Sequence, residues 1–235
     1  MKLSEPVARL KRKARLLSRA EGIPLHAALD RIAVGEGFRS WGLLAARAPS
    51  AAGEIHAGLT PGDLVLLAAR PGLGKTLMGL ELAVEAVKAG QRAFFFTLEY
   101  TESDVLARLR AIGVDRRELG AAFAFDCSDA ISASYIEDAL ATAPSGTLAV
   151  IDYLQLLDQS RDKPDLDSQV RALRSFAQRQ GVILVFISQI DRRFAPSRNR
   201  FPALTDVRLP NALDLSLFSK ACFLNGAGYS FRSLQ

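Results

Sequence analysis

Cysteine and long apolar runs are scarce in this sequence of 235 residues. Its two cysteines, Cys127 and Cys222, are too few for the disulfide framework of a small secreted protein. The longest apolar runs, 64–69 and 182–187, are far shorter than the roughly 20 residues that a membrane-spanning helix needs. The first residues also lack the apolar stretch of a secretory signal. These absences predict a reduced, cytoplasmic protein with no membrane partner.

Acidic residues are outnumbered by basic ones only near the N-terminus. The net charge is +5, and residues 1–47 alone contribute +6, from ten Lys and Arg against four Asp and Glu. The other 188 residues contribute −1. Such a basic segment suits an anionic partner. A solvated helix face that is rich in Arg and Lys explains it equally well.

The same basic segment has the pattern of three short helices. Apolar residues recur every three or four positions from Val7 to Leu17, which indicates an amphipathic helix, and Gly22 ends it. Pro24 can open a second helix. A third is expected around Trp41. We therefore expect a small helical unit at the N-terminus.

From residue 58 onward, short apolar runs alternate with helical patterns. Strands are expected at 64–68, 93–97, 122–125, 148–151 and 182–188, helices at about 75–89, 102–112, 132–143 and 165–180, and a hairpin at 220–232. Runs that are apolar throughout are typical of strands buried on both faces of a parallel sheet. The fold class is thus α/β, with a mostly parallel sheet between helices. The expected boundaries are 1–47 for the basic helical unit, 48–57 for a linker of small residues and 58–235 for the α/β domain.

A glycine-rich segment at 69–76 lies between an apolar run and a helical pattern, which is the context of a phosphate-binding loop. Its backbone N–H groups can surround phosphate oxygens at the positive end of the helix. Lys75 would contact the β- and γ-phosphates, and Thr76 would bind Mg²⁺. The expected nucleotide contacts are Arg70, Pro71, Gly72, Leu73, Gly74, Lys75, Thr76 and Leu77. The alternative is a helix N-cap turn that binds no ligand.

Three polar side chains follow other apolar runs, and ligands of such folds bind at the carboxyl ends of strands. Asp152 would hold the magnesium as the second half of a nucleotide site. Glu99 could orient and polarise an attacking water. Gln189 could sense the γ-phosphate or that water. Each could instead be an ordinary polar group at a strand end.

Five segments, in this order, resemble consecutive motifs of the C-terminal motor domain of DnaB-type replicative helicases: 61–64, 69–76, 96–99, 151–156 and 187–192. The string Asp-Tyr-Leu-Gln at 152–155 is the most specific of them. Ala69, which stands where the general loop pattern has glycine, is normal for this family.

The resemblance implies a RecA-like P-loop NTPase core that uses ATP and Mg²⁺. It makes Glu99 the catalytic glutamate, Asp152 the Walker B acid and Gln189 the residue that couples nucleotide state to DNA. It also implies a hexameric ring with ATP at subunit interfaces, and single-stranded DNA as the partner. ATP turnover would drive translocation on DNA or its remodelling.

A basic stretch after the last of these motifs is a candidate DNA-binding loop, because arginines can follow phosphates while rings such as Phe194 and Phe201 stack on bases. The candidate residues are Arg192, Arg193, Arg198, Arg200 and Arg208. The alternative is an exposed loop without a ligand.

The sequence also departs from the family. The family's large N-terminal domain is replaced by residues 1–47, and its final Lys-x-Arg pair, which reaches the γ-phosphate of the neighbouring subunit, is missing from residues 220–235. Where such a finger has been measured, its loss costs a factor of roughly 10³–10⁵ in rate. Lys220 and Arg232 are possible substitutes. A second hypothesis is therefore a weakly or non-hydrolysing, nucleotide-gated adaptor for DNA or protein, related to replicative helicases and acting alone or with another helicase subunit.

Overall fold

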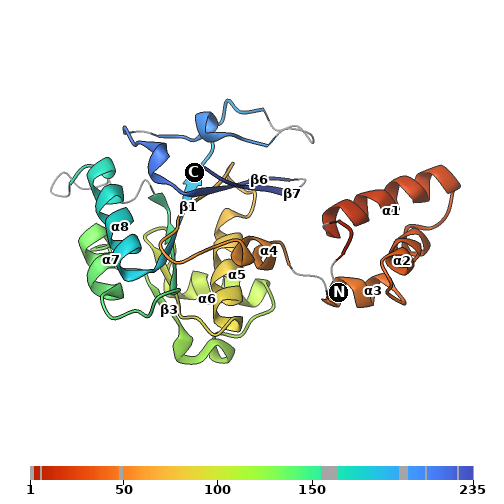
Figure 1. The fold of residues 1–235 in the computed structure, drawn as a ribbon, viewed down its shortest axis with the longest axis horizontal. Coiled ribbons are helices and arrows are strands. Elements are labelled where there is room, and N and C mark those ends of the chain that lie inside the picture. The colour runs from red at the N-terminus through yellow and green to blue at the C-terminus, as the bar shows by residue number, and fades with distance from the viewer. Residues whose placement is uncertain are drawn as a thin grey trace. The chain divides into compact units, whose positions relative to one another are not determined.

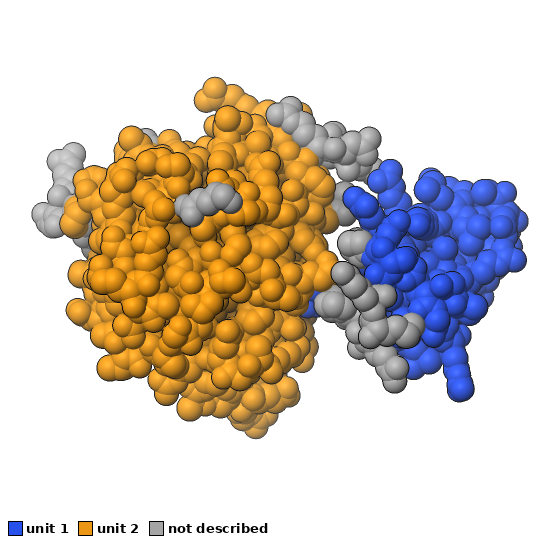
Figure 2. Space-filling view, in the orientation of Figure 1, with its two compact units in different colours: residues 1–50 blue, residues 51–235 orange. Residues whose placement is uncertain are grey.

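The chain forms two compact units in the computed structural model, residues 1–50 and residues 51–235 (Figure 2). The structure describes residues 3–5, 7–47, 50–154, 164–195, 201–209, 211–226 and 228–234. Among these residues, no helix has the length and apolar character that crossing a membrane requires.

The first unit contains the three expected helices: α1 (Val7–Glu21), α2 (Leu25–Gly35) and α3 (Trp41–Arg47). Leu10, Ala33 and Leu44 are buried at the centre of this unit, and Trp41 packs against them. Pro24 precedes α2 with a φ of −56°, which suits the start of a helix. The helical prediction for this unit is confirmed.

The predicted linker at 48–57 is wrong from residue 51 onward, because Ala51–Ala57 form helix α4. Ala52 and Ile55 of α4 are fully buried in the core of the second unit. Alanine has the highest helix propensity, so small residues are as compatible with a helix as with a linker. Burial of Ile55 then favours the helix.

The second unit is built on a seven-stranded sheet with the order β3-β2-β4-β5-β1-β6-β7. The strands are β1 (Leu64–Ala69), β2 (Ala93–Thr97), β3 (Phe123–Asp126), β4 (Leu148–Asp152), β5 (Ile183–Gln189), β6 (Lys220–Asn225) and β7 (Gly228–Ser233). All neighbouring pairs are parallel except β6 and β7, which form the expected hairpin. The α/β prediction is confirmed, and the five strands expected at 64–188 differ from the observed ones by about one residue at their ends.

Helices cover both faces of this sheet (Figure 1). They are α4, α5 (Lys75–Lys88), α6 (Glu102–Ala111), α7 (Ala133–Leu140) and α8 (Leu166–Gln180), with short 3₁₀ turns at η1 (Arg116–Ala122), η3 (Leu204–Asp206) and η4 (Leu215–Leu217). Alternate residues of each strand enter two separate cores. One core contains residues of α4, α5 and α6, and the other contains residues of α7, α8 and η4. Strands buried on both faces explain why the apolar runs do not alternate.

The parallel strands bring four predicted site segments to one edge of the sheet. Thr97, at the end of β2, lies opposite Asp152 at the end of β4. Gln189, at the end of β5, lies opposite Ala69 at the end of β1. The carboxyl edge of the sheet therefore holds the segments that the sequence analysis singled out.

Candidate functional site

The glycine-rich loop leaves β1 at Arg70 and enters helix α5 at Lys75. Gly72 and Gly74 both have a φ of +78°, which is the left-handed region where a Cβ is unfavourable. The Leu73 N–H donates to the Arg70 carbonyl at 3.2 Å, so the loop closes on itself before the helix begins. This conformation requires glycine at 72 and 74, and it supports the prediction of a phosphate-binding loop.

Lys75 and Thr76 form the first turn of α5 and are 8% and 7% exposed. Their burial follows from the geometry of the loop, which places the start of α5 beneath the sheet's carboxyl edge. A lysine is rarely buried without a compensating negative group. Here the positive charge of Lys75 lies near enough to Asp152 to lower the pKa of that carboxyl.

Asp152 is the most unusual side chain of this edge. It is 1% exposed, and neither carboxylate oxygen has a hydrogen-bond partner of ordinary geometry. Burial raises the pKa of Asp152 to about 6, with a smaller upward effect from Glu99. The Thr76 hydroxyl and the charges of Lys75 and Arg108 offset part of that rise. A buried carboxylate without partners is unfavourable unless a cation joins it.

These residues fit a magnesium ion that arrives with a nucleotide. No group of three or more His, Cys, Asp or Glu side chains that could hold a metal exists within the described part of the chain. Mg²⁺ in nucleotide sites commonly takes only one or two protein carboxylates, and phosphates and waters complete its shell. The unpartnered Asp152 carboxylate beside the Thr76 hydroxyl provides such a partial donor set.

Glu99 and Gln189 complete the predicted set. Glu99 is exposed two residues beyond β2, and its N–H donates to the Thr97 Oγ1 at 3.2 Å. Its charge raises the pKa of Asp152, so the two carboxylates face the same region. Gln189 is half-buried, and its carbonyl accepts the Arg208 N–H at 2.8 Å. The roles assigned to both residues stay predictions.

Sequence reasoning missed Arg108, which also belongs to this region. Its guanidinium lies 3.7 Å from the centre of the Tyr100 ring and donates to the Asp104 carbonyl at 3.2 Å. Its charge helps to lower the pKa of Asp152. Its sequence position on α6 gives no signal of this proximity, which depends on the tertiary fold.

The predicted DNA-binding arginines are only partly described. Arg192 and Arg193 are exposed just after β5, and Arg193 lies 3.5 Å from Asp191. Arg208 is exposed, and its charge lowers the pKa of Tyr153 against the dominant effect of burial, so it lies near the end of β4. The other two candidates, Arg198 and Arg200, lie outside the described residues.

Lys220 and Arg232 lie at the opposite, amino edge of the sheet. Lys220 begins β6 and forms an ion pair with Asp63, just before β1. Arg232 pairs in register with Ala221, and its guanidinium lies 5.2 Å from the centre of the Phe223 ring. Within its own chain, neither cation is placed to act at the carboxyl edge.

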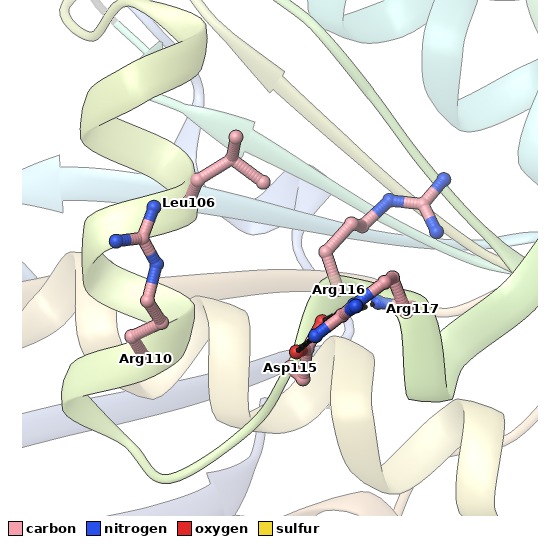
Figure 3. A pocket seen from close by; sticks show the side chains of 5 residues that line it. All are labelled: Leu106, Arg110, Asp115, Arg116 and Arg117. Atoms are coloured by element: carbon pink, nitrogen blue, oxygen red, sulfur yellow. Dashed lines mark hydrogen bonds and ion pairs between the residues drawn. The ribbon is translucent and has the colours of Figure 1, made fainter.

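A hollow of about 460 Å³ lies away from the predicted site, between α6 and the start of η1 (Figure 3). Leu106 and Arg110 line it from the helix, and Asp115, Arg116 and Arg117 line it from the other side. Arg117 pairs with Asp115 at 2.6 Å, and Arg116 donates to the Gly120 carbonyl at 2.8 Å. The hollow contains no residue of the predicted nucleotide site.

The loop and the sheet have counterparts among known proteins. The family model for the DnaB-like helicase C-terminal domain matches residues 51–122, which include α4, the glycine-rich loop and Glu99. The chain resembles the DnaB-like helicase C-terminal domain. The resemblance expected from the sequence motifs is confirmed.

The chain is also similar in sequence to individual DnaB helicases. The replicative DNA helicase DnaB of Leifsonia xyli subsp. xyli is 28% identical over 196 residues, which cover 68% of this chain and 42% of the relative. The chain therefore spans about two-fifths of the length of that curated relative.

Solved structures confirm the fold class. One solved ATPase domain superposes with a TM-score of 0.56 at 22% identity and covers 71% of this chain and 70% of that one. A DnaB-like replicative helicase, solved in a study of its interactions with primase, also gives 0.56, at 21% identity over 69% of this chain and 47% of that one. The α/β unit thus has the RecA-like fold of DnaB-like ATPase domains.

Proposed function

We propose that the second unit is a Mg²⁺-dependent ATPase of the helicase type. The observation that carries the proposal is the buried Asp152 carboxylate, which has no hydrogen-bond partner of ordinary geometry and lies at the end of β4 near Lys75 and Thr76. Apart from nucleotide binding, this arrangement would only destabilise the protein. The DnaB-like resemblance adds independent support.

Each residue of the carboxyl edge has a role in this proposal. The loop from Arg70 to Gly74 and the start of α5, through Leu77, bind the phosphates, with Lys75 on the β- and γ-phosphates. Thr76 and Asp152 hold Mg²⁺, which supplies charge neutralisation for the phosphates. Glu99 orients the attacking water and accepts its proton. Gln189 hydrogen-bonds the γ-phosphate or the water and is the link to DNA.

Single-stranded DNA is the proposed substrate of this motor. The exposed Arg192, Arg193 and Arg208 lie near the ends of β4 and β5, next to the nucleotide site, so a strand bound there would sense the nucleotide. Arg198 and Arg200 of the same loop are included on sequence grounds. Phosphate contacts of this kind bind without sequence preference.

A ring of copies, a hexamer by resemblance, or a complex with another helicase subunit would bring a cation of a neighbouring chain to the γ-phosphate. In this arrangement the first unit, residues 1–50, is an accessory helical domain. Size-exclusion chromatography with light scattering, in the presence and absence of a non-hydrolysable ATP analogue, tests the ring. A monomer in both states contradicts it.

A weakly hydrolysing, nucleotide-gated adaptor is the second candidate. The observation that favours it is the ion pair between Lys220 and Asp63, which holds this cation within its own chain instead of leaving it for the γ-phosphate of a neighbouring subunit. Such an adaptor would bind Mg-ATP tightly and respond to it by conformational change.

Steady-state ATP hydrolysis, measured with Mg²⁺ and with or without single-stranded DNA, distinguishes the two candidates. Glu99→Gln is the blank, because it removes the base while keeping the volume of the side chain. A motor hydrolyses ATP faster with DNA, and Glu99→Gln loses about 10²-fold or more of that rate. An adaptor binds ATP but turns over no faster than the blank. If the unchanged chain and Glu99→Gln bind ATP no better than Lys75→Ala, which lacks the phosphate-binding lysine, the proposed function is wrong.

A further inference from the structure

Positive charge is concentrated on α1 of the first unit. This helix carries six Lys and Arg, which are all exposed, and its only acid is Glu21 at the last position. The six are Arg9, Lys11, Arg12, Lys13, Arg15 and Arg19. The proposed ATPase site uses none of them.

Four of these cations form one row along the helix. Lys11, Arg15 and Arg19 follow each other at four-residue intervals, and Arg12 lies beside them. At 1.5 Å per residue the row is about 12 Å long. Leu10 and Ala14 are buried on another side of the helix, so the row faces away from the core of the unit. We call Lys11, Arg12, Arg15 and Arg19 the α1 basic row.

The acids of this unit do not neutralise the α1 basic row. All four are engaged elsewhere: Glu5 by Lys13 at 2.9 Å, Glu21 by Arg31, Asp30 by the Trp41 N–H at 2.8 Å and Glu36 by the Ser4 N–H at 2.8 Å. Within the described residues, no acid pairs with any member of the row. Four like charges in this spacing repel one another. A polyanion would relieve that repulsion.

Some exposed cations of the second unit do have acidic partners. Lys88 pairs with Glu85 at 3.0 Å, and Arg117 pairs with Asp115 at 2.6 Å, although both cations are exposed. Exposure alone therefore does not leave cations without acids in this protein. The α1 basic row is exceptional because four neighbouring cations lack such partners.

The α1 basic row itself contains no aromatic ring, and the two aromatic rings of the first unit are half-buried. Phe38 and Trp41, its only aromatic residues, both pack against its core cluster. Rings that stack on bases are the usual means of recognising nucleobases in single strands. The row therefore offers a ligand positive charge and no stacking surface of its own.

We propose that the α1 basic row binds the phosphodiester backbone of nucleic acid without reading bases. Guanidinium and ammonium groups spaced along a rigid helix displace the counterions of several phosphates at once, which gives binding that depends steeply on salt. This site lies on a different unit from the proposed ATPase, so it stands or falls independently of ATP hydrolysis.

The test uses the full chain and two variants of equal charge. One variant replaces Lys11, Arg12, Arg15 and Arg19 by Gln. The matched control replaces four cations that have acidic partners, Lys13, Arg31, Lys88 and Arg117, by Gln. Fluorescence anisotropy measures the Kd for single-stranded and duplex DNA of equal length and mixed sequence, over a range of salt concentrations. Circular dichroism checks folding, since Gln is a good helix former.

The row variant is expected to bind at least about ten-fold more weakly at low salt, with a slope of log K against log salt that falls by about 2 to 4. The control is expected to stay within about two-fold of the unchanged chain. The stronger of the two DNA arms identifies the source of the phosphates. Equal losses in both variants would reduce the effect to net charge and overturn the proposal.

If the row variant binds DNA as well as the unchanged chain does, the proposal is also overturned. Binding to polyglutamate is measured in the same way. If the row variant loses binding to polyglutamate but not to DNA, the row binds an acidic protein and the proposal is wrong. ATP hydrolysis without DNA is measured in parallel and is expected to be the same in both variants. If hydrolysis is absent while the row still binds DNA, the proposed function fails and this inference does not.

Discussion

Two buried aspartates at opposite edges of the same sheet have opposite surroundings. Asp63, just before β1, is 6% exposed, and Asp152, at the end of β4, is 1% exposed. Burial raises the pKa of both carboxyls, yet Asp63 ends below its ordinary value and Asp152 rises to about 6. The difference lies in their hydrogen-bond partners.

Both carboxylate oxygens of Asp63 accept hydrogen bonds. One oxygen accepts the Thr60 N–H at 2.7 Å, the Thr60 hydroxyl at 3.0 Å and the Lys220 ammonium, and the other accepts the Ser219 hydroxyl at 2.7 Å. Thr60 precedes β1, Ser219 directly precedes the neighbouring strand β6, and Lys220 begins β6. The network thus joins two strands that are distant in sequence, and its role is structural.

Asp152 has no such partners, and the nearby charges of Lys75 and Arg108 only partly compensate its burial. A site that is unfavourable when empty and favourable with a cation is typical of binding rather than of stability. The comparison teaches that burial alone does not separate structural from functional acids in this fold. The hydrogen-bond partners do.

The largest expected effect on stability comes from breaking the amino-edge network. Asp63→Asn leaves the Lys220 ammonium, whose side chain is 16% exposed, without a negative partner, which should reduce the free energy of unfolding by about 3 kcal/mol. Urea denaturation measures it. In the double variant Asp63→Asn, Lys220→Met, part of this loss should return, because no unpaired charge remains. A double variant as unstable as the sum of the single variants would contradict the network.

The same substitution at the carboxyl edge should have the opposite sign. Asp152→Asn removes a buried charge, so the nucleotide-free protein should gain about 2 kcal/mol at neutral pH. In thermal unfolding this is a rise of roughly 5 °C. If Asp152→Asn lowered the stability as Asp63→Asn does, the two aspartates would be alike and the comparison would fail.

Acid should remove the advantage of Asp152→Asn. The pKa of Asp152 is about 6 in the folded chain and 3.8 ordinarily, so the folded state binds more protons between these values. Stability due to this group therefore rises as the pH falls from about 6 to 4. The variant should exceed the unchanged chain at pH 7 and equal it near pH 4. Because Asp63 has a lowered pKa, its contribution is lost only as the pH falls below about 3.8.

Arg108 should give the smallest change in stability. Arg108→Gln removes the contact with the Tyr100 ring, which is worth about 0.5–1 kcal/mol at a partly exposed site. It also removes a positive charge near Asp152, so under the proposed function we expect about ten-fold slower ATP turnover. Arg108→Lys keeps the charge and should recover part of that rate. An unchanged rate in Arg108→Gln would limit Arg108 to a structural role.

Much of this architecture could be predicted from the sequence, because it depends on local patterns. The strand runs and the loop at 69–76 specify their own conformation through apolar residues and glycines. The family motifs occur in the expected order along the chain, which supported the same fold. The helix at Ala51–Ala57 could not be predicted, because its alanines suit a linker equally well and only the burial of Ile55 in the tertiary core decides.

The candidate site was predictable as a set of strand ends but not in its electrostatics. The sequence placed Asp152 and Glu99 at one edge, yet the absence of partners around Asp152 depends on how completely β2 and β5 enclose β4. Likewise, Lys220 could be proposed as a finger only because its pairing with Asp63, 157 residues away, is invisible in sequence.

The magnesium–nucleotide site at Asp152 is best tested by thermal unfolding of the unchanged chain and of Asp152→Asn at neutral pH, each with and without Mg-ATP. We expect the order of stability of the two proteins to reverse when Mg-ATP is added. Asp152→Asn is more stable without ligand, and the unchanged chain is more stable with saturating Mg-ATP, since ligand at about 100 Kd adds about 2.7 kcal/mol. Equal stabilisation of both proteins by Mg-ATP, or a less stable Asp152→Asn without ligand, would contradict a magnesium–nucleotide site at Asp152.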